Sequence, residues 1–473
     1  MQVTQQPERE EWRIVVPRHG ASEFLLSVSD TRFSLPKVEI PPRCRTAETL
    51  NAEIERSWEL KVVSRFSLGS IPNGNDGSRC RYYVVEALRS AAPPPSGMAW
   101  EPLASLTEHA FKDTADFLAI RLALAPSTGS GREGIDGPFR KPGWFAELVE
   151  WTQSVIRPLG LHLTGDFKQF NASPTFSLVR LETSGPAVWF KAVGAPNLRE
   201  FPITIALARS LPCYLPRLIA TREDWNGWLA EEAEGVNLGD TGDIDLWLRA
   251  AVQLATFQIE FTKKANGVLQ SSFRDARLHT LSQVVEPFFR FLAEVADQQI
   301  QANCSALGQP DLLSLEHEIK TTLIELRNLN FPDTIGHFDI NPGNVVLSSE
   351  RCTFLDWAEG FVGHPFFTFQ YFLEYFRRAF PNDDLSAARM TEGYASQWSS
   401  RATISEIREA LSLSALGAVF AYALNSVAWR GAQAARDKQV VNFAASLTKH
   451  MERKTGRIYQ RANLGGCNES SAP

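Results

Sequence analysis

The stretch IGHFDINPGNVVLSSERCTFLDWAEGF, at residues 335–361, combines two apolar runs with several polar side chains. Asp339 and Asn344 precede the apolar run VVL, and Asp356 follows the second run, TFL. Two short apolar runs separated by a Ser-Ser-Glu turn predict a β-hairpin. Because the two ends of a hairpin lie close together, we expect two carboxylates and one amide to converge on one point.

Converging oxygen atoms are typical ligands for Mg²⁺ carrying a nucleotide phosphate, with a further carboxylate facing an acceptor hydroxyl. The order H-x-D-x-x-x-x-N from His337 to Asn344, with Asp356 twelve residues later, resembles the catalytic and metal loops of the protein kinase superfamily. The metal loop reads LDW in place of D-F-G, so it is more similar to the aminoglycoside phosphotransferase and choline kinase branch. The alternative is that these polar residues cluster by chance. The apolar strand before Asp356 argues against this alternative.

This resemblance implies a role for each residue of the hairpin region. Asp339 would be the catalytic base, and Asn344 and Asp356 would hold Mg²⁺. His337 would belong to the same catalytic loop and would buttress it. The implied cofactors are ATP and Mg²⁺, and the implied reaction is phosphoryl transfer to a hydroxyl of a small molecule. Aminoglycosides, choline, homoserine and sugar-like molecules all remain open as acceptors.

Three runs upstream, at residues 163–170, 175–183 and 187–193, read as strands. In the family, the first two strands fold over the nucleotide phosphates, and the third carries a phosphate-binding lysine. The sequence AVWFK matches the V-A-I-K signature in shape and nominates Lys191, although a solvated lysine at a strand end is the alternative. The loop NASPT lacks the glycines of protein kinases, so backbone N–H groups and Ser173 are expected to contact phosphate there.

Residues 197–210 read as a helix, with Asn197 as its N-cap. Glu200 then lies in the first turn, where by resemblance it would pair with Lys191. The helix dipole alone also favours a glutamate at that position, which is the alternative interpretation. Residues 231–235 would form the hinge between two lobes, where backbone groups would pair with adenine.

Beyond the hinge, apolar residues spaced by three and four predict helices at residues 243–262, 278–297 and 312–329. A further helical region follows the hairpin and extends to about residue 461. The family commonly has an aspartate in the segment GHPFFTF, where this chain has Thr368. The uncharged segment 410–429 is about long enough to span a bilayer, but we predict a buried helix of a large helical lobe.

The N-terminal region predicts a second, smaller domain. Short strands precede a helix at residues 46–58, two further strands follow, and a last helix is expected at 107–124. This order, with LPKVEIP before the helix and W-x-P-L after the late strand, resembles a Nudix domain. The Nudix metal site needs several glutamates on one helix face. Glu53 is present, but Arg56 and Ser57 occupy the paired-glutamate positions, so we expect no metal and no hydrolase activity. An unrelated small α/β domain is the alternative.

The predicted fold class is therefore α+β. A bilobal protein-kinase-like fold, with a small β-rich N-lobe and a large helical C-lobe, would follow a small α/β Nudix-like domain. We expect the Nudix-like domain at residues 1–125 and a Gly/Pro-rich linker at 126–143. A connecting helix with the N-lobe would occupy 144–235, and the C-lobe with the hairpin would occupy 236–465.

Composition limits the possible partners. The chain has 473 residues, 44% of them hydrophobic and 22% charged, as is typical of a globular protein of two or three domains. A net charge of −6 argues against a general nucleic-acid or anionic-membrane surface. Six isolated cysteines without C-x-x-C spacing, and an N-terminus without an apolar core, predict a cytoplasmic protein with reduced thiols. We expect no nucleic-acid or membrane partner, and the oligomeric state stays open.

Two rival functions remain. The first is a nucleotide-binding pseudokinase that acts as a regulator, with the N-terminal domain as its recognition module. The complete His337, Asp339, Asn344 and Asp356 set argues against it. The second is a Nudix-type hydrolase with a scaffold attached, which the missing glutamates oppose.

Overall fold

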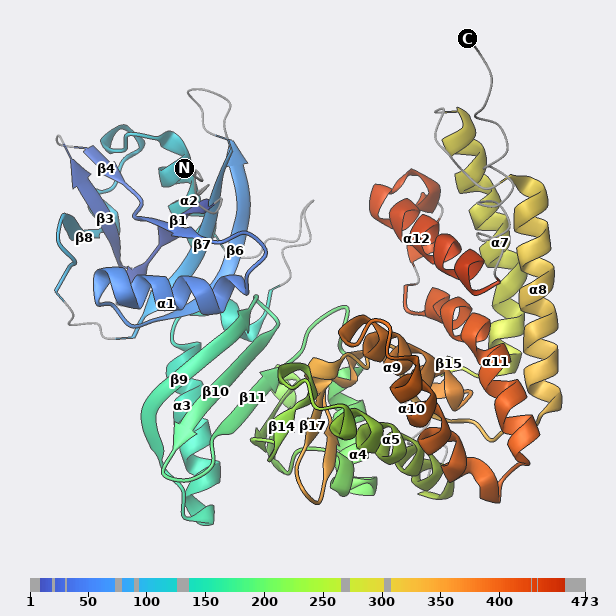
Figure 1. Cartoon of the computed structure of the whole chain (residues 1–473). Helices are drawn as coiled ribbons and strands as arrows, with labels where there is room; N and C mark the ends of the chain where they lie inside the picture. Colours follow the sequence, from blue (N-terminus) through green and yellow to red (C-terminus); the bar gives the residue numbers. More distant parts are fainter. Residues whose placement is uncertain are drawn as a thin grey trace, which may run out of the picture. The chain divides into compact units, whose positions relative to one another are not determined.

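The computed structural model describes residues 9–18, 22–29, 32–72, 79–88, 93–125, 136–264, 273–301, 308–426, 428–431 and 433–455. Most of the predicted linker, at 126–135, lies outside the described residues, as do the glycine-rich turn at 73–77 and the C-terminal tail. The chain divides into two compact units (Figure 1). The first comprises Met1–Phe201 and Arg217–Glu232, and the second comprises Pro202–Pro216 and Ala233–Pro473.

The N-terminal part of the first unit contains two sheets and two helices. The larger sheet has the strand order β5-β1-β7-β6, in which β1 runs parallel to β7. The smaller sheet has the order β2-β3-β4, with β8 also paired to β3. These elements are β1 (Glu10–Val15), β2 (Pro17–Arg18), β3 (Glu23–Ser29), β4 (Arg32–Ser34), β5 (Lys37–Ile40), α1 (Thr46–Trp58), β6 (Val62–Pro72), β7 (Arg79–Ala87), β8 (Met98–Pro102) and α2 (Thr114–Leu124).

The larger sheet is buried on both faces because its side chains alternate in direction along each strand. On β7, Tyr83 and Val85 pack in the core that contains the buried face of α1. Tyr82 and Val84 belong to the second core, together with residues of α2. The predicted sequence of strands, helix, two strands and helix is present, but β2 and β8 were not predicted and the last helix begins later than expected.

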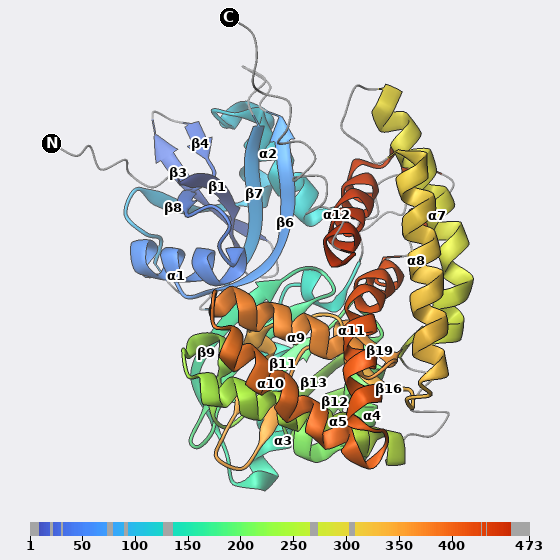
Figure 2. The same ribbon diagram turned by 45° about the vertical axis from the view of Figure 1, so that its right-hand side comes forward.

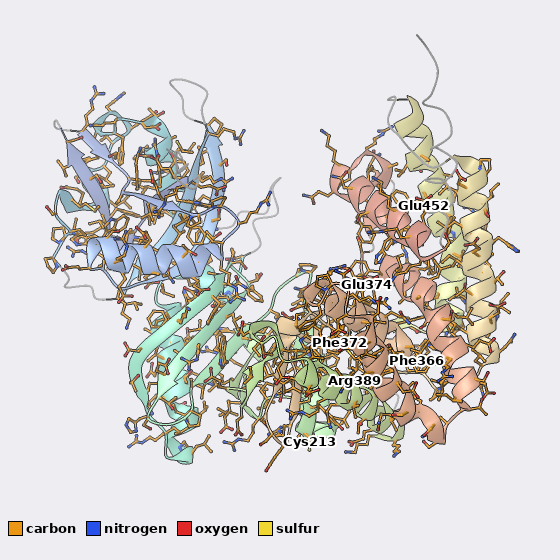
Figure 3. The ribbon with its side chains drawn as sticks, viewed as in Figure 1. Cys213, Phe366, Phe372, Glu374, Arg389 and Glu452 are labelled. Carbon is orange, nitrogen blue, oxygen red and sulfur yellow. The ribbon has the colours of Figure 1, made fainter. Side chains whose placement is uncertain are left out.

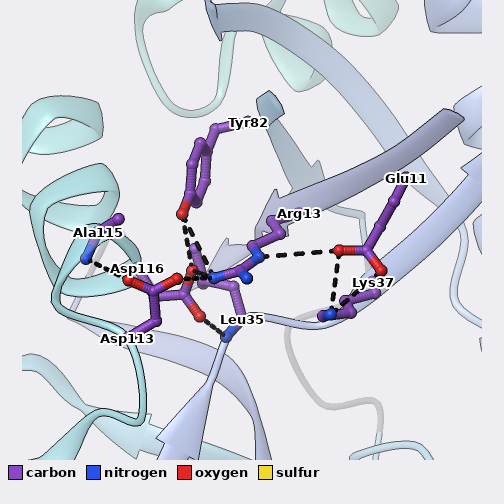
Figure 4. Close-up of polar contacts among 8 residues, drawn as sticks. All are labelled: Glu11, Arg13, Leu35, Lys37, Tyr82, Asp113, Ala115 and Asp116. Atoms are coloured by element: carbon purple, nitrogen blue, oxygen red, sulfur yellow. Dashed lines mark hydrogen bonds and ion pairs between the residues drawn. The ribbon is translucent and has the colours of Figure 1, made fainter. Parts of the chain in front are cut away.

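A buried ion-pair network joins the sheet to α2 (Figure 4). Arg13 Nη1 lies 2.6 Å from a carboxylate oxygen of both Asp113 and Asp116. The Tyr82 hydroxyl donates to Asp116 at 3.0 Å, and the Leu35 backbone N–H donates to the same carboxylate at 2.8 Å. Asp113 also caps α2, since its side chain accepts from the backbone N–H of the second helical residue. The sequence predicted that this helix begins near residue 107. The cap explains why α2 begins at Thr114 instead.

The remainder of the first unit is a five-stranded antiparallel sheet with α3 packed on it. The strand order is β12-β13-β11-β10-β9. Inward-facing residues of β10, β11 and β13 form one core with the buried face of α3. The elements are α3 (Trp144–Ile156), β9 (Leu163–Ala172), β10 (Ser177–Thr183), β11 (Val188–Ala192), β12 (Leu218–Arg222) and β13 (Gly227–Glu231). Helix α4 (Glu200–Ser210) begins in this unit, but from Pro202 onward it belongs to the second unit.

The second unit is mostly helical and has one large core. Helices α7 and α8 run side by side, and α11 packs against α8 (Figure 2). Two small sheets, β14-β17-β18 and β15-β19-β16, hold the hairpin region. The elements are β14 (Val236–Asn237), α5 (Ile244–Lys264), β15 (Arg274–Ala276), α7 (Leu278–Gln301), α8 (Gln309–Asn328), β16 (Thr334–His337), β17 (Val345–Leu347), β18 (Cys352–Phe354), β19 (Gly360–Gly363), α9 (Phe366–Ala379), α10 (Asp384–Gln397), α11 (Ile404–Ala421) and α12 (Lys438–Lys454).

The uncharged segment of the sequence falls mainly in α11. The stretch Ile404–Leu424 is long and apolar enough to cross a membrane by length and composition alone, and 61% of its most apolar window is buried in the protein. Helices α8, α9 and α12 pack against α11. This packing agrees with the prediction of a buried helix within a helical lobe.

Candidate active site

The hairpin predicted from the sequence is present and places three polar residues at its two ends. Strands β17 and β18 are antiparallel, and Val345 is paired with Phe354. The Leu355 backbone N–H donates to the Asn344 carbonyl at 2.8 Å, which extends the pairing by one step. Asn344 therefore lies at the entrance of the hairpin and Asp356 directly after its exit, as expected.

His337 supports the loop that contains Asp339, the role that the family resemblance implies for it. Its side chain is buried, and its Nδ1 accepts the backbone N–H of Asp339 at 3.0 Å. Its Nε2, which carries the proton in this tautomer, lies 3.2 Å from the Leu355 carbonyl oxygen. Burial lowers the pKa of His337, which keeps the ring neutral and its Nδ1 available as an acceptor. The imidazole thus joins the loop before the hairpin to the strand end that precedes Asp356.

Asp339 and Asn344 are in direct contact. The Asn344 side-chain Nδ2 lies 3.0 Å from the Asp339 carbonyl oxygen and 3.4 Å from its Oδ2. The Asn341 side chain donates to Asp339 Oδ1 at 2.9 Å. Because the Asn344 amide nitrogen is engaged by Asp339, its Oδ1 is the atom suited to a metal ion.

Asp356 lies in the left-handed backbone region, with a φ of 58°. Aspartate tolerates this conformation better than β-branched or bulky residues. The turn ends β18 abruptly and leads into a short helical turn at Trp357–Glu359. Asp356 is exposed, whereas the Trp357 side chain is buried beneath it and its indole donates to the Phe354 carbonyl at 3.2 Å. The apolar neighbour therefore anchors the turn on which the carboxylate lies.

A cavity of about 440 Å³ lies beside Asp339 within the second unit. This volume is in the range of small-molecule binding sites. Its lining is rich in carboxylates and aromatic rings: Phe338, Asp339, Glu359, Tyr371, Glu374, Tyr375, Arg378, Tyr422, Phe443, Ser446, Leu447 and His450.

Two carboxylates of this cavity differ in their surroundings. Burial raises the pKa of Glu359, and its Oε2 has no hydrogen-bond partner among the described residues. Glu374, on α9 (Figure 3), instead contacts three basic side chains. These are His450 at 2.8 Å, Lys454 at 2.5 Å and Arg378 at 3.4 Å. Burial acts to raise the pKa of Glu374, but hydrogen bonds from His450 and Lys454 outweigh it and lower that pKa to about 2. Glu374 therefore joins α9 to α12, whereas Glu359 is a half-buried carboxylate of the cavity lining that also has a hydrogen bond with Asn425.

In the first unit, Lys191 and Glu200 form the ion pair expected from the sequence. Lys191 lies on β11, and its Nζ is 2.5 Å from Glu200 Oε1. The Glu200 side chain is only 2% exposed, and that of Lys191 is 13% exposed. The prediction that Asn197 caps the helix is wrong. Successive turns from Gly194 to Asn197 and from Asn197 to Glu200 occupy this segment, so α4 begins at Glu200.

Ser173 lies in the tight turn between β9 and β10. Its Oγ accepts the backbone N–H groups of Phe176 at 3.0 Å and Thr175 at 3.3 Å. Its own N–H donates to the Phe176 carbonyl at 2.8 Å. Ser173 therefore stabilises the turn internally, and its hydroxyl proton is the part of the side chain suited to bind a phosphate oxygen.

The α1 residues compared with a Nudix metal site neutralise each other. Arg56 forms an ion pair with Glu53, and the Ser57 hydroxyl donates to the same carboxylate at 3.2 Å. The Arg56 hydrogen bond is the largest cause of the lowered pKa of Glu53. Among the residues that the structure describes, no group of three or more His, Cys, Asp or Glu side chains is arranged to hold a metal ion.

Apart from Asp339, the lining of the cavity was not predicted from the sequence. Glu359 follows Asp356 by three residues, and Tyr371, Glu374 and Tyr375 recur at spacings of three and four. Such spacing places side chains on one helix face, so it was a signal that could have been used. Tyr422 and His450 come from distant segments and carried no local signal.

Comparisons with known proteins agree with the hairpin motif. The model of the phosphotransferase enzyme family (APH) matches residues 195–408. No curated protein matches the chain. Solved structures similar to the chain include a choline kinase from Cryptosporidium parvum Iowa II, with 14% identity and a TM-score of 0.43, covering 66% of this chain and 97% of that one. A Plasmodium vivax ethanolamine kinase has 12% identity and a TM-score of 0.42, covering 70% and 96%. The choline kinase LicA from Streptococcus pneumoniae has 12% identity and a TM-score of 0.41, covering 65% and 99%.

The family match includes Glu200, His337, Asp339, Asn344 and Asp356, and ends within the helical unit. It agrees with a kinase-like fold of mixed helix and sheet. It also confirms the predicted reaction type, with the acceptor unspecified. Residues 195–408 match the phosphotransferase enzyme family, and this match supports a small-molecule phosphotransferase with an unspecified acceptor.

Proposed function

We propose that the chain transfers the terminal phosphoryl group of ATP, with Mg²⁺, to a hydroxyl of a small molecule that carries an ammonium group. The observation that carries this proposal is the cavity beside Asp339. It combines the carboxylate of Glu359 with several tyrosine and phenylalanine rings. A carboxylate and aromatic faces both favour an organic cation, and a protonated amine would pair with the carboxylate of Glu359.

Asp339 is proposed as the catalytic base. It borders the cavity, and its carboxylate is oriented by Asn341 and Asn344. In this role it accepts or orients the proton of the acceptor hydroxyl. His337 is a positioning residue, because it holds the Asp339 backbone without bordering the cavity.

The oxygen chemistry at the hairpin ends fits a hard cation. Asn344 offers an amide oxygen and Asp356 a carboxylate, which are ligand types that Mg²⁺ prefers. When bound, Mg·ATP would supply the phosphoryl group and the charge neutralisation that the reaction requires. In the first unit, Lys191 is proposed to bind the non-transferred phosphates while Glu200 orients it. The Ser173 hydroxyl would contact phosphate, whereas the expected backbone N–H groups of this loop are bonded within the turn.

ATP consumption against a panel of acceptors tests this function. The panel should pair amino-alcohols and aminoglycosides with neutral sugars of similar size. We expect turnover only with amine-bearing acceptors. Glu359→Gln should raise the KM of the acceptor about tenfold or more, as expected for a charged contact worth over 1 kcal/mol, and should leave the KM of ATP unchanged. Turnover of neutral sugars at the same rate would exclude an ammonium requirement, and absence of turnover with any acceptor would favour a pseudokinase.

For the N-terminal region we propose a Nudix-like fold that performs no hydrolysis. The ion pair between Glu53 and Arg56 supports this, since it removes the acidic surface that a divalent cation needs. We keep the boundaries of 1–125, 126–143, 144–235 and 236–465 for the four segments. We also propose a soluble cytoplasmic protein without nucleic-acid or membrane partners, in keeping with the net charge of −6. Pyrophosphohydrolase activity that disappears in Glu53→Gln would contradict the first of these proposals.

A further inference from the structure

A buried glutamine joins the N-terminal domain to β9 of the kinase-like sheet. Gln169 is 2% exposed, although its side chain is polar. Its Oε1 accepts the Ser64 backbone N–H at 2.8 Å and the Asn51 side chain at 3.0 Å, while its Nε2 donates to the Ser64 carbonyl at 3.0 Å. The Ser64 hydroxyl donates to Asn51 Oδ1 at 2.8 Å, which closes the network. Gln169 therefore pairs with a residue of β6 as a neighbouring strand would, and α1 and β6 lie against β9 (Figure 1).

A second connection runs through the short helical turn Pro138–Arg140, just before α3. Arg140 Nη2 donates to the carbonyls of Leu122 and Ala125, at 3.2 and 3.1 Å, where α2 ends. Its guanidinium also lies 4.4 Å from the centre of the Phe66 ring. A cation at a helix C-terminus is stabilising because carbonyls without partners remain there. Arg140 therefore attaches this turn to the N-terminal domain.

The same turn contacts the loop between β9 and β10. The Phe139 backbone N–H donates to the Pro174 carbonyl at 3.1 Å, and the Phe139 ring is fully buried. A Cβ atom on Gly137 would lie 2.1 Å from that carbonyl oxygen, so the two chain segments touch there. On another side of the loop, a Cβ atom on Gly194 would lie 2.1 Å from Thr175 Oγ1. Close backbone contacts thus confine the loop at two points.

We propose that the N-terminal domain is a fixed brace for the loop at residues 171–175, with Gln169 and Arg140 as positioning residues. Gln169 lies two residues before this loop, and Arg140 follows Phe139, whose backbone N–H donates to Pro174 within the loop. The N–H groups of Ser173, Thr175 and Phe176 are bonded within this turn, so the Ser173 hydroxyl must be held in one fixed position to bind phosphate well. The N-terminal domain supplies that rigidity and performs no chemistry itself. The proposal rests on the nucleotide role proposed for this loop.

The test compares nucleotide binding among variants of the full chain. Gln169→Leu removes every hydrogen bond of the amide, and Arg140→Ala removes the contact with α2. Arg140→Lys is the conservative variant, because it keeps one donor and the charge. Lys61→Ala is the matched control at the same interface, since Lys61 contacts Asp166, whose side chain is 76% exposed. The readouts are the Kd of MgADP by calorimetry and backbone hydrogen exchange at residues 171–176.

We expect Gln169→Leu and Arg140→Ala each to raise the Kd of MgADP about tenfold and to speed exchange at residues 171–176. Arg140→Lys should recover most of the binding, and Lys61→Ala should match the wild type. If Gln169→Leu does not fold, the Arg140 pair and the Lys61 control decide the question alone. Unchanged Kd and exchange in folded variants overturn the brace. Failure of the wild type to bind MgADP refutes the proposed function instead, and the two failures are thereby distinguishable.

Discussion

The hydroxyl of Thr368, at the start of α9, accepts the backbone N–H of His337 at 2.8 Å. Both residues are buried, and Thr368 lies in the segment where the sequence resemblance led us to expect an aspartate. A neutral hydroxyl here satisfies the backbone of the catalytic loop without adding a buried charge, which would be costly. The departure from the family pattern thus keeps the support of the loop through different chemistry.

Replacing this hydroxyl should loosen the loop. Thr368→Val keeps the shape but leaves the His337 N–H buried without a partner, so we expect a loss of about 1–3 kcal/mol of stability and slower turnover. Thr368→Ser should retain the hydrogen bond and most of the activity. Urea unfolding together with kcat checks this. Equal stability of the Val and Ser variants would show that the hydrogen bond contributes nothing.

The two aspartates of the hairpin region should fail in different ways. Asp339→Asn removes the proposed base, so kcat should fall by about 10²–10⁴-fold while Mg·ATP binding is spared. Asp356→Asn removes a charged metal ligand and should raise the Mg²⁺ requirement as well as lowering turnover. Titrations of Mg²⁺ and ATP separate the two. Loss of nucleotide binding in Asp339→Asn alone would mean that the base and the metal ligand are interchanged.

The Lys191–Glu200 pair should act on the nucleotide and not on the acceptor. Lys191→Ala should weaken ATP binding and turnover, because the phosphates lose a compensating charge. Glu200→Gln should cause a smaller loss of the same kind, about tenfold in kcat/KM, since the lysine remains but is no longer held. Steady-state kinetics with ATP varied provide the measurement. Unchanged nucleotide constants in Glu200→Gln would show that another acid orients the lysine.

The buried His364 should make the helical unit sensitive to acid. Burial lowers its pKa to about 3, below the value of about 6.5 in an unfolded chain. Below pH 6.5 the unfolded chain therefore binds a proton that the folded protein does not, and stability falls with decreasing pH. Lowering the pH from 7 to 5 should therefore reduce the free energy of unfolding by about 2 kcal/mol through this residue. Urea unfolding at several pH values should show that His364→Phe reduces the pH dependence of the free energy of unfolding by about one proton. An unchanged pH dependence would show that His364 is not the group responsible.

The hairpin and its polar residues could be predicted because their signals are local. The turn, the apolar runs and the spacing of Asp339 and Asn344 all fall within one short segment. The strand that carries Lys191 was likewise readable from its own residues. The start of the next helix was not readable, because the turns that begin at Gly194 place it at Glu200, three residues after Asn197.

The cavity and the contact between domains could not be predicted in this way. Glu359 and His450 belong to segments far apart in the sequence, and only packing of the helical unit brings them to one cavity. Gln169 and Ser64 are separated by 105 residues, and a polar residue in a strand normally indicates a solvated face. Long-range burial of this kind leaves no trace in the spacing of neighbouring residues.

The pairing of Gln169 with Ser64 also has a consequence for self-association. β6 is the last strand of its sheet, as is β9 of its own, so each would offer an open ladder of backbone groups to another molecule. Exposed sheet edges of this kind promote aggregation. Here the two edges face each other, and the Gln169 side-chain amide forms hydrogen bonds with the Ser64 backbone. No continuous ladder of backbone hydrogen bonds is needed there. The sheets stay separate, and each shields the other from intermolecular strand pairing.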